Sequence, residues 1–288
     1  MNEQGLNGNK VDDVRRYMNS KLIPIYGERE AFQISIMIFQ HVMNWSKTDL
    51  IMKKNDRLTE SEILKLHFPT KEIAAGKPVQ YVLGSAYFCG FDFEVNENVL
   101  IPRPETEELV RWVVLENTII NPIVLDFGTG SGCIAISLKK MIPQAAVKGV
   151  ELSEEALNVA KRNAIKLNCE VEFVQSDMRQ FLFECPADII VSNPPYIGIS
   201  ESSEMNSNVV NHEPHIALFV PDEDPLLYYK VLHGLALKNL KSGGMIALEC
   251  HEVYAGAVRD MFLSSGFSNV QLREDMQGKP RMVIALRD

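Results

Sequence analysis

Apolar residues recur at helical spacing through the first 75 or so residues of the chain. Residues 30–45 are apolar on most sides of the predicted helix, which indicates that this helix is largely buried. A second helix is predicted after Thr59, whose hydroxyl can cap it while Glu62 completes a capping box. The Gly-Lys-Pro cluster at 76–78 then interrupts the pattern. The amino-terminal part is therefore expected to form a small helical domain.

The pattern changes from residue 79 onward. Residues 87–95 alternate between aromatic and polar side chains around turn-forming residues, which predicts a β-hairpin. Pro104 opens a helix whose first turn is acidic, as the helix dipole favours. Beyond it, apolar strand segments alternate with helical segments. The predicted strands are 123–127, 146–151, 171–174, 187–192 and 244–250, separated by helices near 132–141, 153–167, 223–240 and 252–265.

Five strands with helical crossovers predict an α/β fold with a doubly wound parallel sheet. Two further strand candidates, 270–273 and 282–286, are separated only by a turn-rich loop and predict an antiparallel hairpin at one edge. The expected organisation is a helical domain at 1–78, a β-hairpin linker at 79–103 and the α/β domain at 104–288.

Composition is that of an ordinary folded protein. Of 288 residues, 46% are hydrophobic and 23% charged, and no apolar run is long enough to span a membrane. Residues 1–5 are polar, unlike a signal peptide. The five cysteines are scattered without a Cys-x-x-Cys pair, so we expect neither a disulfide framework nor a zinc site, and a cytoplasmic protein.

The charge balance argues against a nucleic-acid substrate. The chain carries 29 basic and 38 acidic side chains, a net charge of −9, and residues 101–288 account for −8 of it. A protein that binds a nucleic-acid backbone is usually basic, because its cations replace the counterions of the phosphates.

A glycine-rich segment follows the first predicted strand, where glycines let the backbone approach a ligand and present amide groups at a helix start. Its spacing is Gly-x-Gly-x-Gly, and Cys133 stands where the dinucleotide fingerprint would have its third glycine. Asp126 would repel a pyrophosphate but suits a cationic amino acid. A structural turn remains the alternative for this segment alone. The residues are Asp126, Gly128, Thr129, Gly130, Ser131 and Gly132.

Two more predicted strands end in acidic side chains. Glu151 lies 19 residues beyond Gly132, where a carboxylate can accept both hydroxyl hydrogens of a ribose. Asp177 follows the third strand and would reach an adenine edge, with Met178 as an apolar neighbour of the ring. Both interpretations depend on the glycine segment being a ligand loop.

The segment Asn193-Pro194-Pro195-Tyr196 leaves the fourth strand at the edge of the sheet where ligands bind in open α/β folds. The prolines stiffen the turn and leave carbonyl groups free as acceptors. Asn193 adds a side-chain amide, and Tyr196 adds a flat face. These groups could hold a planar –NH2 group by its two hydrogens.

The glycine segment followed by Asn-Pro-Pro-Tyr resembles the S-adenosylmethionine-dependent amino-methyltransferases, which act on adenine N6, cytosine N4 or the glutamine amide. Three further segments narrow the resemblance to the HemK/PrmC family of protein-(glutamine-N5) methyltransferases, which modify peptide chain release factors. These segments are residues 76–84, 100–107 and 213–218.

The resemblance implies a Rossmann-like class I methyltransferase fold, S-adenosyl-L-methionine as cofactor and class 1 release factors as protein partners, recognised in part by the helical domain. No direct nucleic-acid partner, membrane or metal is expected, and the protein is expected to be monomeric. The implied cofactor contacts are Asp126, Gly128, Thr129, Gly130, Ser131, Gly132, Glu151, Asp177, Met178 and Asn193. The implied catalytic and substrate contacts are Asn193, Pro194, Pro195 and Tyr196, with Phe88 and Arg103 near the opening of the cleft.

An adenine-N6 nucleic-acid methyltransferase shares the tetrapeptide but conflicts with the acidic charge, and a glutamine methyltransferase acting on a ribosomal protein stays open. A nicotinamide dehydrogenase conflicts with the glycine spacing, and a non-catalytic adaptor with the intact tetrapeptide. His212 and His215 lack a third ligand at a fitting spacing, so they are interpreted as solvated residues of a long polar loop, 197–221. This loop is long enough to cover the site.

Overall fold

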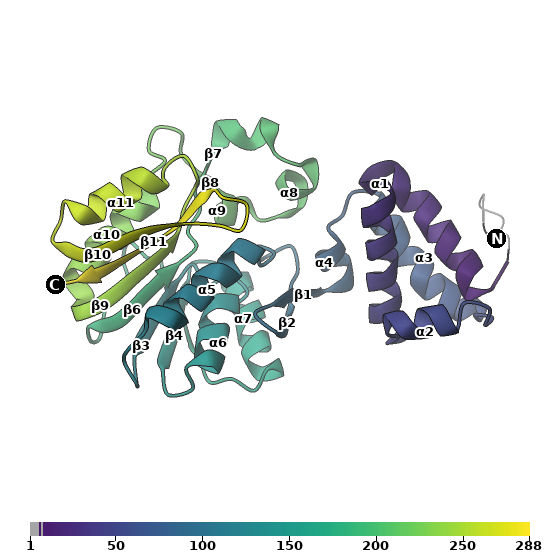
Figure 1. The fold of residues 1–288 in the computed structure, drawn as a ribbon, viewed down its shortest axis with the longest axis horizontal. Helices are drawn as coiled ribbons and strands as arrows, with labels where there is room; N and C mark the ends of the chain where they lie inside the picture. Colours follow the sequence, from purple (N-terminus) through teal and green to yellow (C-terminus); the bar gives the residue numbers. More distant parts are fainter. Residues whose placement is uncertain (1–5, 7) are drawn as a thin grey trace. The chain divides into compact units, whose positions relative to one another are not determined.

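The computed structural model describes residue 6 and residues 8–288, except for the side chain of residue 207. Residues 1–5, whose polar composition is unlike that of a signal peptide, lie outside the described residues. The chain forms two units, coloured along the sequence in Figure 1. The first unit comprises the chain up to Gly84 together with Ser207–His212, and the second comprises Ser85–Asn206 and Glu213–Asp288.

The first unit is helical, as the apolar spacing predicts. Its helices are α1 (Val11–Met43), α2 (Lys47–Met52), α3 (Glu60–Ala74), α4 (Val79–Leu83) and α8 (Ser207–His212). Helix α1 bends at Gly27, whose backbone is not helical. The predicted capping box is confirmed at the start of α3, where Thr59 and Glu62 exchange hydrogen bonds. No sequence pattern indicated that α8, far along the chain, belongs to this unit.

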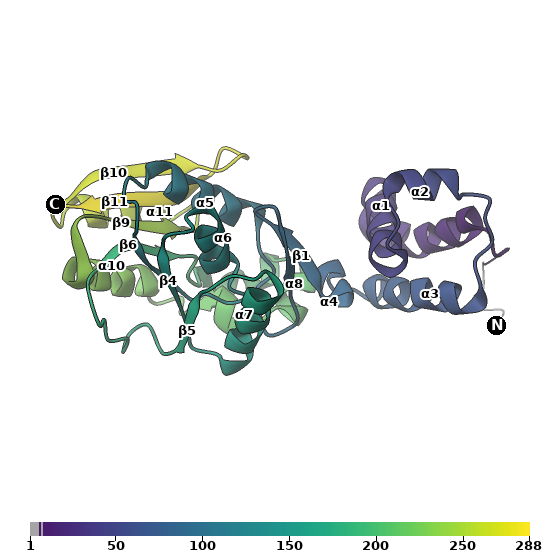
Figure 2. The ribbon, with the colours of Figure 1, turned by 90° about the horizontal axis from the view of Figure 1, so that it is seen from below.

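The second unit contains a seven-stranded sheet in the order β10-β11-β9-β6-β3-β4-β5 (Figures 1 and 2). Its strands are β3 (Ile123–Phe127), β4 (Ala146–Glu151), β5 (Glu172–Gln175), β6 (Ala187–Ser192), β9 (Leu240–Glu249), β10 (Phe267–Glu274) and β11 (Pro280–Arg287). Five of them run parallel, while β11 is antiparallel to both β9 and β10. The predicted parallel sheet with a carboxyl-terminal antiparallel hairpin is thus confirmed.

Helices cover both faces of this sheet (Figure 1). One core joins the sheet to α5 (Pro104–Glu116), α6 (Cys133–Met141) and α7 (Glu154–Lys166), and includes Val110, Ile134 and Ile189. The other core joins it to α10 (Leu227–Asn239) and α11 (Ala255–Leu263), and includes Leu125, Tyr229 and Val258. This two-sided covering explains why the central strands are continuous apolar runs.

The predicted hairpin forms from β1 (Ser85–Phe88) and β2 (Phe91–Glu94). Cys89 and Gly90 both have positive φ, as a tight two-residue turn between antiparallel strands requires. The hairpin belongs to the second unit, whereas the sequence interpretation made it a linker.

The interpretation of residues 197–221 as a long loop is wrong. The segment contains β7 (Ile197–Gly198), the 3-10 helix η1 (Ile199–Glu204), α8, α9 (His215–Leu218) and β8 (Phe219–Val220). The two short strands pair in parallel and tie its ends together. Asp222 also accepts hydrogen bonds from the backbone and hydroxyl of Ser200. These contacts connect residues distant in the segment, so no local pattern indicates them.

No helix in the described part of the chain is long and apolar enough to cross a membrane.

Candidate active site

The glycine loop lies between β3 and α6, at the carboxyl end of the parallel strands. Gly128, Gly130 and Gly132 all have positive φ, a conformation that other residues adopt with strain. A Cβ atom on Gly132 would also lie 3.1 Å from both Ala160 Cβ and Ile136 Cδ1. Glycine at this position therefore permits close packing of the loop against α7 as well as the turn itself.

Asp126 lies behind this loop and is completely buried. Its Oδ2 accepts hydrogen bonds from Thr129 Oγ1 at 2.6 Å and from the Ala135 backbone N–H at 3.2 Å. Its other oxygen, Oδ1, is buried with no hydrogen-bond partner among the described residues. Burial raises the pKa of Asp126 to about 7. The carboxyl group thus fixes the loop and keeps one unused acceptor.

Glu151 ends β4 beside the loop. Its Oε2 accepts a hydrogen bond from the Gly130 N–H at 2.9 Å, and its Oε1 accepts from the N–H groups of Leu152 and Ser153 at 2.8 and 3.0 Å. The carboxylate is therefore held in a fixed position at the loop, in the register that the sequence suggested.

A pocket opens in front of the loop. Asp177 and Met178 lie in its wall, and Asp177 pairs with Arg179, whose hydrogen bonds lower the pKa of that carboxyl group. Its lining includes Asn98, Val99, Leu100, Gly128, Gly130, Val150, Glu151, Leu152, Ser153, Asp177, Met178, Asn193, Pro195, Pro214, Ile216 and Ala217. Thr129, Ser131 and Gly132 do not line the pocket in the described chain; they shape the loop behind it.

The groups around this pocket fit S-adenosylmethionine. Glu151 can accept hydrogens from ribose hydroxyls, and Val150, Leu152 and Met178 offer apolar surface for an adenine ring. Asp126 does not line the pocket and has no exposed surface, so its orphaned Oδ1 is not presented to a ligand in this conformation. The Glu151 carboxylate beside the loop would repel a dinucleotide pyrophosphate.

The tetrapeptide 193–196 begins directly after β6. Asn193 and Pro195 line the pocket, while Pro194 is buried. Asn193 Nδ2 donates to Thr106 Oγ1 at 3.1 Å, and the Tyr196 hydroxyl donates to Glu249 Oε1 at 3.1 Å. Burial and the neighbouring charge of Glu249 raise the pKa of Tyr196, so its phenol stays neutral.

Thr106 and Glu249 are hydrogen-bonded to the tetrapeptide, and neither was predicted as a site residue from the sequence. Thr106 Oγ1 donates to Glu249 Oε2 at 2.6 Å, and both side chains are buried. Burial raises the pKa of Glu249, while its hydrogen bonds with Thr106 and Tyr196 lower it. The signal was present: Thr106 lies in the family-like segment 100–107, and Glu249 ends β9, a strand of the same sheet.

Arg103 forms an ion pair with Glu213, in which Nη2 of Arg103 lies 2.6 Å from Oε1 of Glu213. The side chain of Glu213 is only 1% exposed, and its second oxygen accepts from the Ile101 N–H at 3.2 Å. Pro214 and Ala217, just beyond Glu213, line the pocket. This ion pair therefore fastens one wall of the pocket to the segment before α5.

Phe88 does not lie at the opening of the pocket. Its side chain has no exposed surface and packs in the core, where its ring meets Phe93 edge-on at 6.0 Å. A side chain without exposed atoms cannot touch a substrate in this conformation, so Phe88 is a core residue and not a substrate contact. An aromatic residue of a hairpin is equally suited to core packing, which is why the sequence could not distinguish the two.

Thiol and metal chemistry is not assembled in the described chain. All five cysteines are free thiols, and burial raises the pKa of Cys89 to about 11 and that of Cys133 to about 12. Within the described residues, no three His, Cys, Asp or Glu side chains are grouped as ligands for a metal ion.

Comparison with known protein families gives two matches. The family described as Methyltransferase small domain matches residues 109–214, and the PrmC N-terminal domain matches residues 14–84. Among curated proteins, a Release factor glutamine methyltransferase from Flavobacterium psychrophilum is 36% identical, covering 95% of this chain and 98% of its own. A protein of the same name from Bacteroides thetaiotaomicron is 38% identical, covering 96% and 100%, respectively.

Solved structures share the fold at lower identity. A methyltransferase from Pyrococcus furiosus aligns with a TM-score of 0.51 and 22% identity over 69% of this chain and 89% of its own. The hMettl16 catalytic domain, solved in complex with an RNA hairpin, aligns with a TM-score of 0.55 and 17% identity over 76% and 81%. These likenesses establish the class I methyltransferase fold of the sheet-containing unit.

Proposed function

The chain belongs to the release factor glutamine methyltransferases, and on that premise we propose that it methylates the glutamine of the Gly-Gly-Gln motif in class 1 peptide chain release factors. The methyl group would pass from S-adenosylmethionine to the side-chain amide nitrogen, N5. The observation that carries this proposal is the position of Asn193. Its amide, which can bind a substrate –NH2, lines the same pocket as Gly130 and Glu151.

The cofactor end of the site consists of the glycine loop and the acidic residues around it. S-adenosylmethionine, when bound, supplies a methyl group on a positively charged sulfur that is a good leaving group. Glu151 would hold the ribose, Asp177 and Met178 would flank the adenine, and Asp126 would hold the glycine loop from behind through Thr129 and Ala135. The acidic character of these side chains also favours the sulfonium charge.

The substrate end consists of residues 193–196. An amide nitrogen is a poor nucleophile because its lone pair is delocalised into the carbonyl group. Asn193 Oδ1 and the Pro194 carbonyl would accept the two amide hydrogens and hold the nitrogen with its lone pair directed at the methyl group. The ring of Tyr196 would pack against the amide plane, and Pro195 would keep the turn stiff. No strong base is needed, since the product loses its proton readily.

Partner recognition is proposed to involve the helical unit. The Gly-Gly-Gln loop belongs to a folded protein that works against ribosomal RNA, so we expect the release factor to present a basic surface. The net charge of −8 over residues 101–288 would favour its encounter with the sheet-containing unit. We further propose that the protein acts as a monomer in the cytoplasm, where translation terminates.

The experiment is transfer of labelled methyl groups to three classes of acceptor in parallel. These are purified release factors, ribosomal proteins, and adenine-containing DNA and RNA. Labelling of a release factor, with nucleic acid unlabelled, supports the proposal. Labelling of a ribosomal protein alone would keep the proposed reaction and replace the release factor as its substrate. Labelling of adenine alone would overturn the proposal.

A further inference from the structure

Hydrogen bonds connect the two ends of the tetrapeptide through a buried carboxylate. Glu249, at the end of β9, accepts from Thr106 Oγ1 with one oxygen and from the Tyr196 hydroxyl with the other. Thr106 in turn accepts from Asn193 Nδ2. The two intermediaries are 2% and 1% exposed, so water does not compete for these bonds.

The number of hydrogens on each group decides which group donates and which accepts in these hydrogen bonds. Both groups that face Glu249 are hydroxyls, so a carboxylate accepting from both uses the one hydrogen that each hydroxyl has. Because the only hydroxyl hydrogen of Thr106 is used for Glu249, Thr106 can only accept a hydrogen bond from Asn193. The end of the Asn193 amide that faces Thr106 must then be the donor, Nδ2. The opposite end, Oδ1, is therefore the acceptor left for a substrate –NH2.

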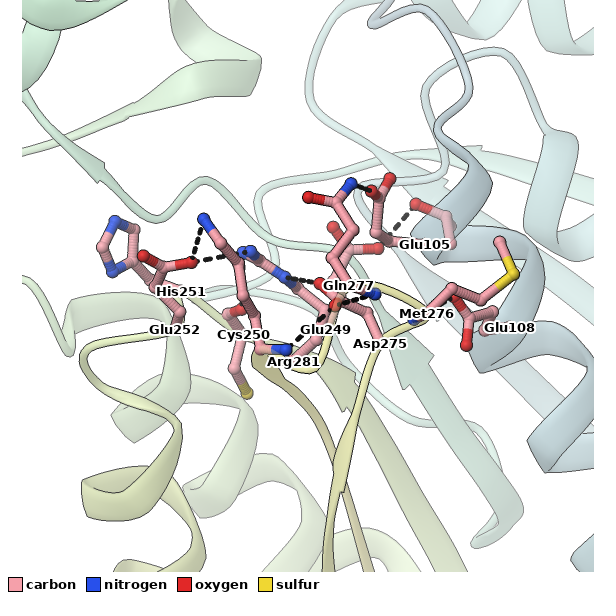
Figure 3. Close-up of polar contacts among 12 residues, drawn as sticks. Glu105, Glu108, Glu249, Cys250, His251, Glu252, Asp275, Met276, Gln277 and Arg281 are labelled. Atoms are coloured by element: carbon pink, nitrogen blue, oxygen red, sulfur yellow. Dashed lines mark hydrogen bonds and ion pairs between the residues drawn. The ribbon is translucent and has the colours of Figure 1, made fainter.

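Burial raises the pKa of Glu249, and the hydrogen bonds from Thr106 and Tyr196 oppose this rise. Arg281 on β11 opposes it too through its positive charge, which also acts on Tyr196. Its guanidinium is held by Asp275 at 3.1 Å and by Glu252 at 3.3 Å (Figure 3).

The loop between β10 and β11 also steadies the helix turn that carries Thr106. The Met276 N–H donates to Glu108 at 3.2 Å, and Gln277 Nε2 donates to Glu105 at 3.4 Å (Figure 3). Thr106 thus lies between two residues of α5 that are fixed to the carboxyl-terminal hairpin.

We propose that Thr106 and Glu249 are positioning residues for methyl transfer: they hold the Asn193 amide with its oxygen toward the substrate and anchor Tyr196 at the same time. This inference rests on the proposed function, because it assigns a substrate –NH2 to Asn193. It also gives a physical role to the threonine of the segment 100–107, which the sequence identified only by resemblance.

The test compares three variants in the release factor assay. Thr106→Val keeps the shape but removes the hydroxyl, Thr106→Ser keeps the hydroxyl, and Glu249→Gln places an –NH2 against one of the two hydroxyls. We expect kcat to fall about 10- to 100-fold in Thr106→Val and Glu249→Gln. The Kd for S-adenosylmethionine should stay close to that of the wild type, and Thr106→Ser should recover most of kcat.

Thr70→Val is the matched control, since Thr70 is a buried threonine in α3 that donates only to the Leu66 carbonyl. It should leave kcat unchanged. A Thr106→Val or Glu249→Gln enzyme with wild-type kcat would overturn the inference, as would a Thr106→Ser enzyme as slow as Thr106→Val. An equal loss of cofactor affinity and kcat would also overturn it. A wild-type protein that leaves release factors unmodified would instead refute the proposed function.

Discussion

At the scale of single residues, replacing Asn193 tests whether the substrate end and the cofactor end of the site act separately. Asn193→Ala removes the acceptor for the substrate amide and the contact with Thr106, while the glycine loop and Glu151 remain. We expect kcat to fall by about 100-fold or more, the effect of losing one preorganised polar group. Calorimetry should find the affinity for S-adenosylmethionine much less changed. Comparable losses in both quantities would assign Asn193 mainly to the cofactor pocket.

Asp126 predicts a pH dependence of stability. Its pKa rises from 3.8 to about 7 on folding, so the folded protein keeps a proton that the unfolded chain releases. Its contribution to stability is complete below the unfolded pKa and is lost as pH rises to about 7, at up to about 1.4 kcal/mol per pH unit.

The matched variant is Asp126→Asn, which does not ionise and keeps an acceptor for Thr129 and Ala135. Chemical denaturation without cofactor, at about pH 5 and pH 8, measures the two free energies of unfolding. We expect wild type to lose stability relative to Asp126→Asn across this interval. Parallel pH profiles would show that Asp126 does not titrate as described.

The residues of the site differ in how readily the sequence predicts them. The tetrapeptide, the glycine loop and Glu151 each combine a recognisable residue type with a strand end, so they were predictable. The positions of Thr106 and Glu249 were visible in the sequence, but their contact was not, because it joins a helix and a strand 143 residues apart. Phe88 was wrongly included because an aromatic side chain gives no sign of which face it will bury.

At the scale of elements, a bulky side chain in the glycine loop is expected to block cofactor binding. Gly130 has a φ of +53° and lines the pocket, so a bulky side chain there would enter the cofactor space. Gly130→Val should weaken S-adenosylmethionine binding at least about 100-fold, or about 2.7 kcal/mol. The control is Gly243→Val, at an exposed glycine with a φ of +75° and no atom near its Cβ position. Equal losses in calorimetry would mean that backbone strain, and not the pocket, is responsible.

The ion pair between Arg103 and Glu213, which fastens one wall of the pocket, is expected to contribute to the stability of the fold. Arg103→Ala leaves the buried Glu213 carboxylate without its cation and should lower the free energy of unfolding by about 1–3 kcal/mol. Adding Glu213→Gln should restore part of this loss, because a neutral amide needs no counterion.

Arg111→Ala is the control for this experiment. It breaks an exposed pair with Glu107 and should cost less than about 1 kcal/mol. Denaturant unfolding compares these proteins, and an Arg103→Ala protein as stable as wild type would contradict a structural role for the ion pair.

The regular elements were predictable for a physical reason. Parallel strands covered by helices on both faces are continuous apolar runs, so the five parallel strands could be found in the sequence. The segment 197–221 could not, because its short strands and helices are stabilised by contacts within the folded units. Helix α8 is the extreme case, since its partners lie more than 100 residues earlier.

At the scale of the whole molecule, the first unit is assembled from two distant parts of the chain. Asn208 of α8 lies against Gly76 and shares a side-chain hydrogen bond with Tyr26. Deleting the amino-terminal helices would therefore strip α8 of its packing partners. Substrate recognition by this unit is better tested by surface substitutions in the full chain.

The measurement that tests the central claim most directly is the location of the methyl group on a release factor. After incubation with the protein and S-adenosylmethionine, mass spectrometry should find one added methyl group on the intact factor. Fragmentation should assign it to the side-chain amide of the Gly-Gly-Gln glutamine. A factor with alanine at that glutamine should gain none, and a short peptide with the same loop should react far more slowly, because it lacks the remote binding contacts. A methyl group at another residue, or an unmodified factor beside methylated adenine, would contradict the account.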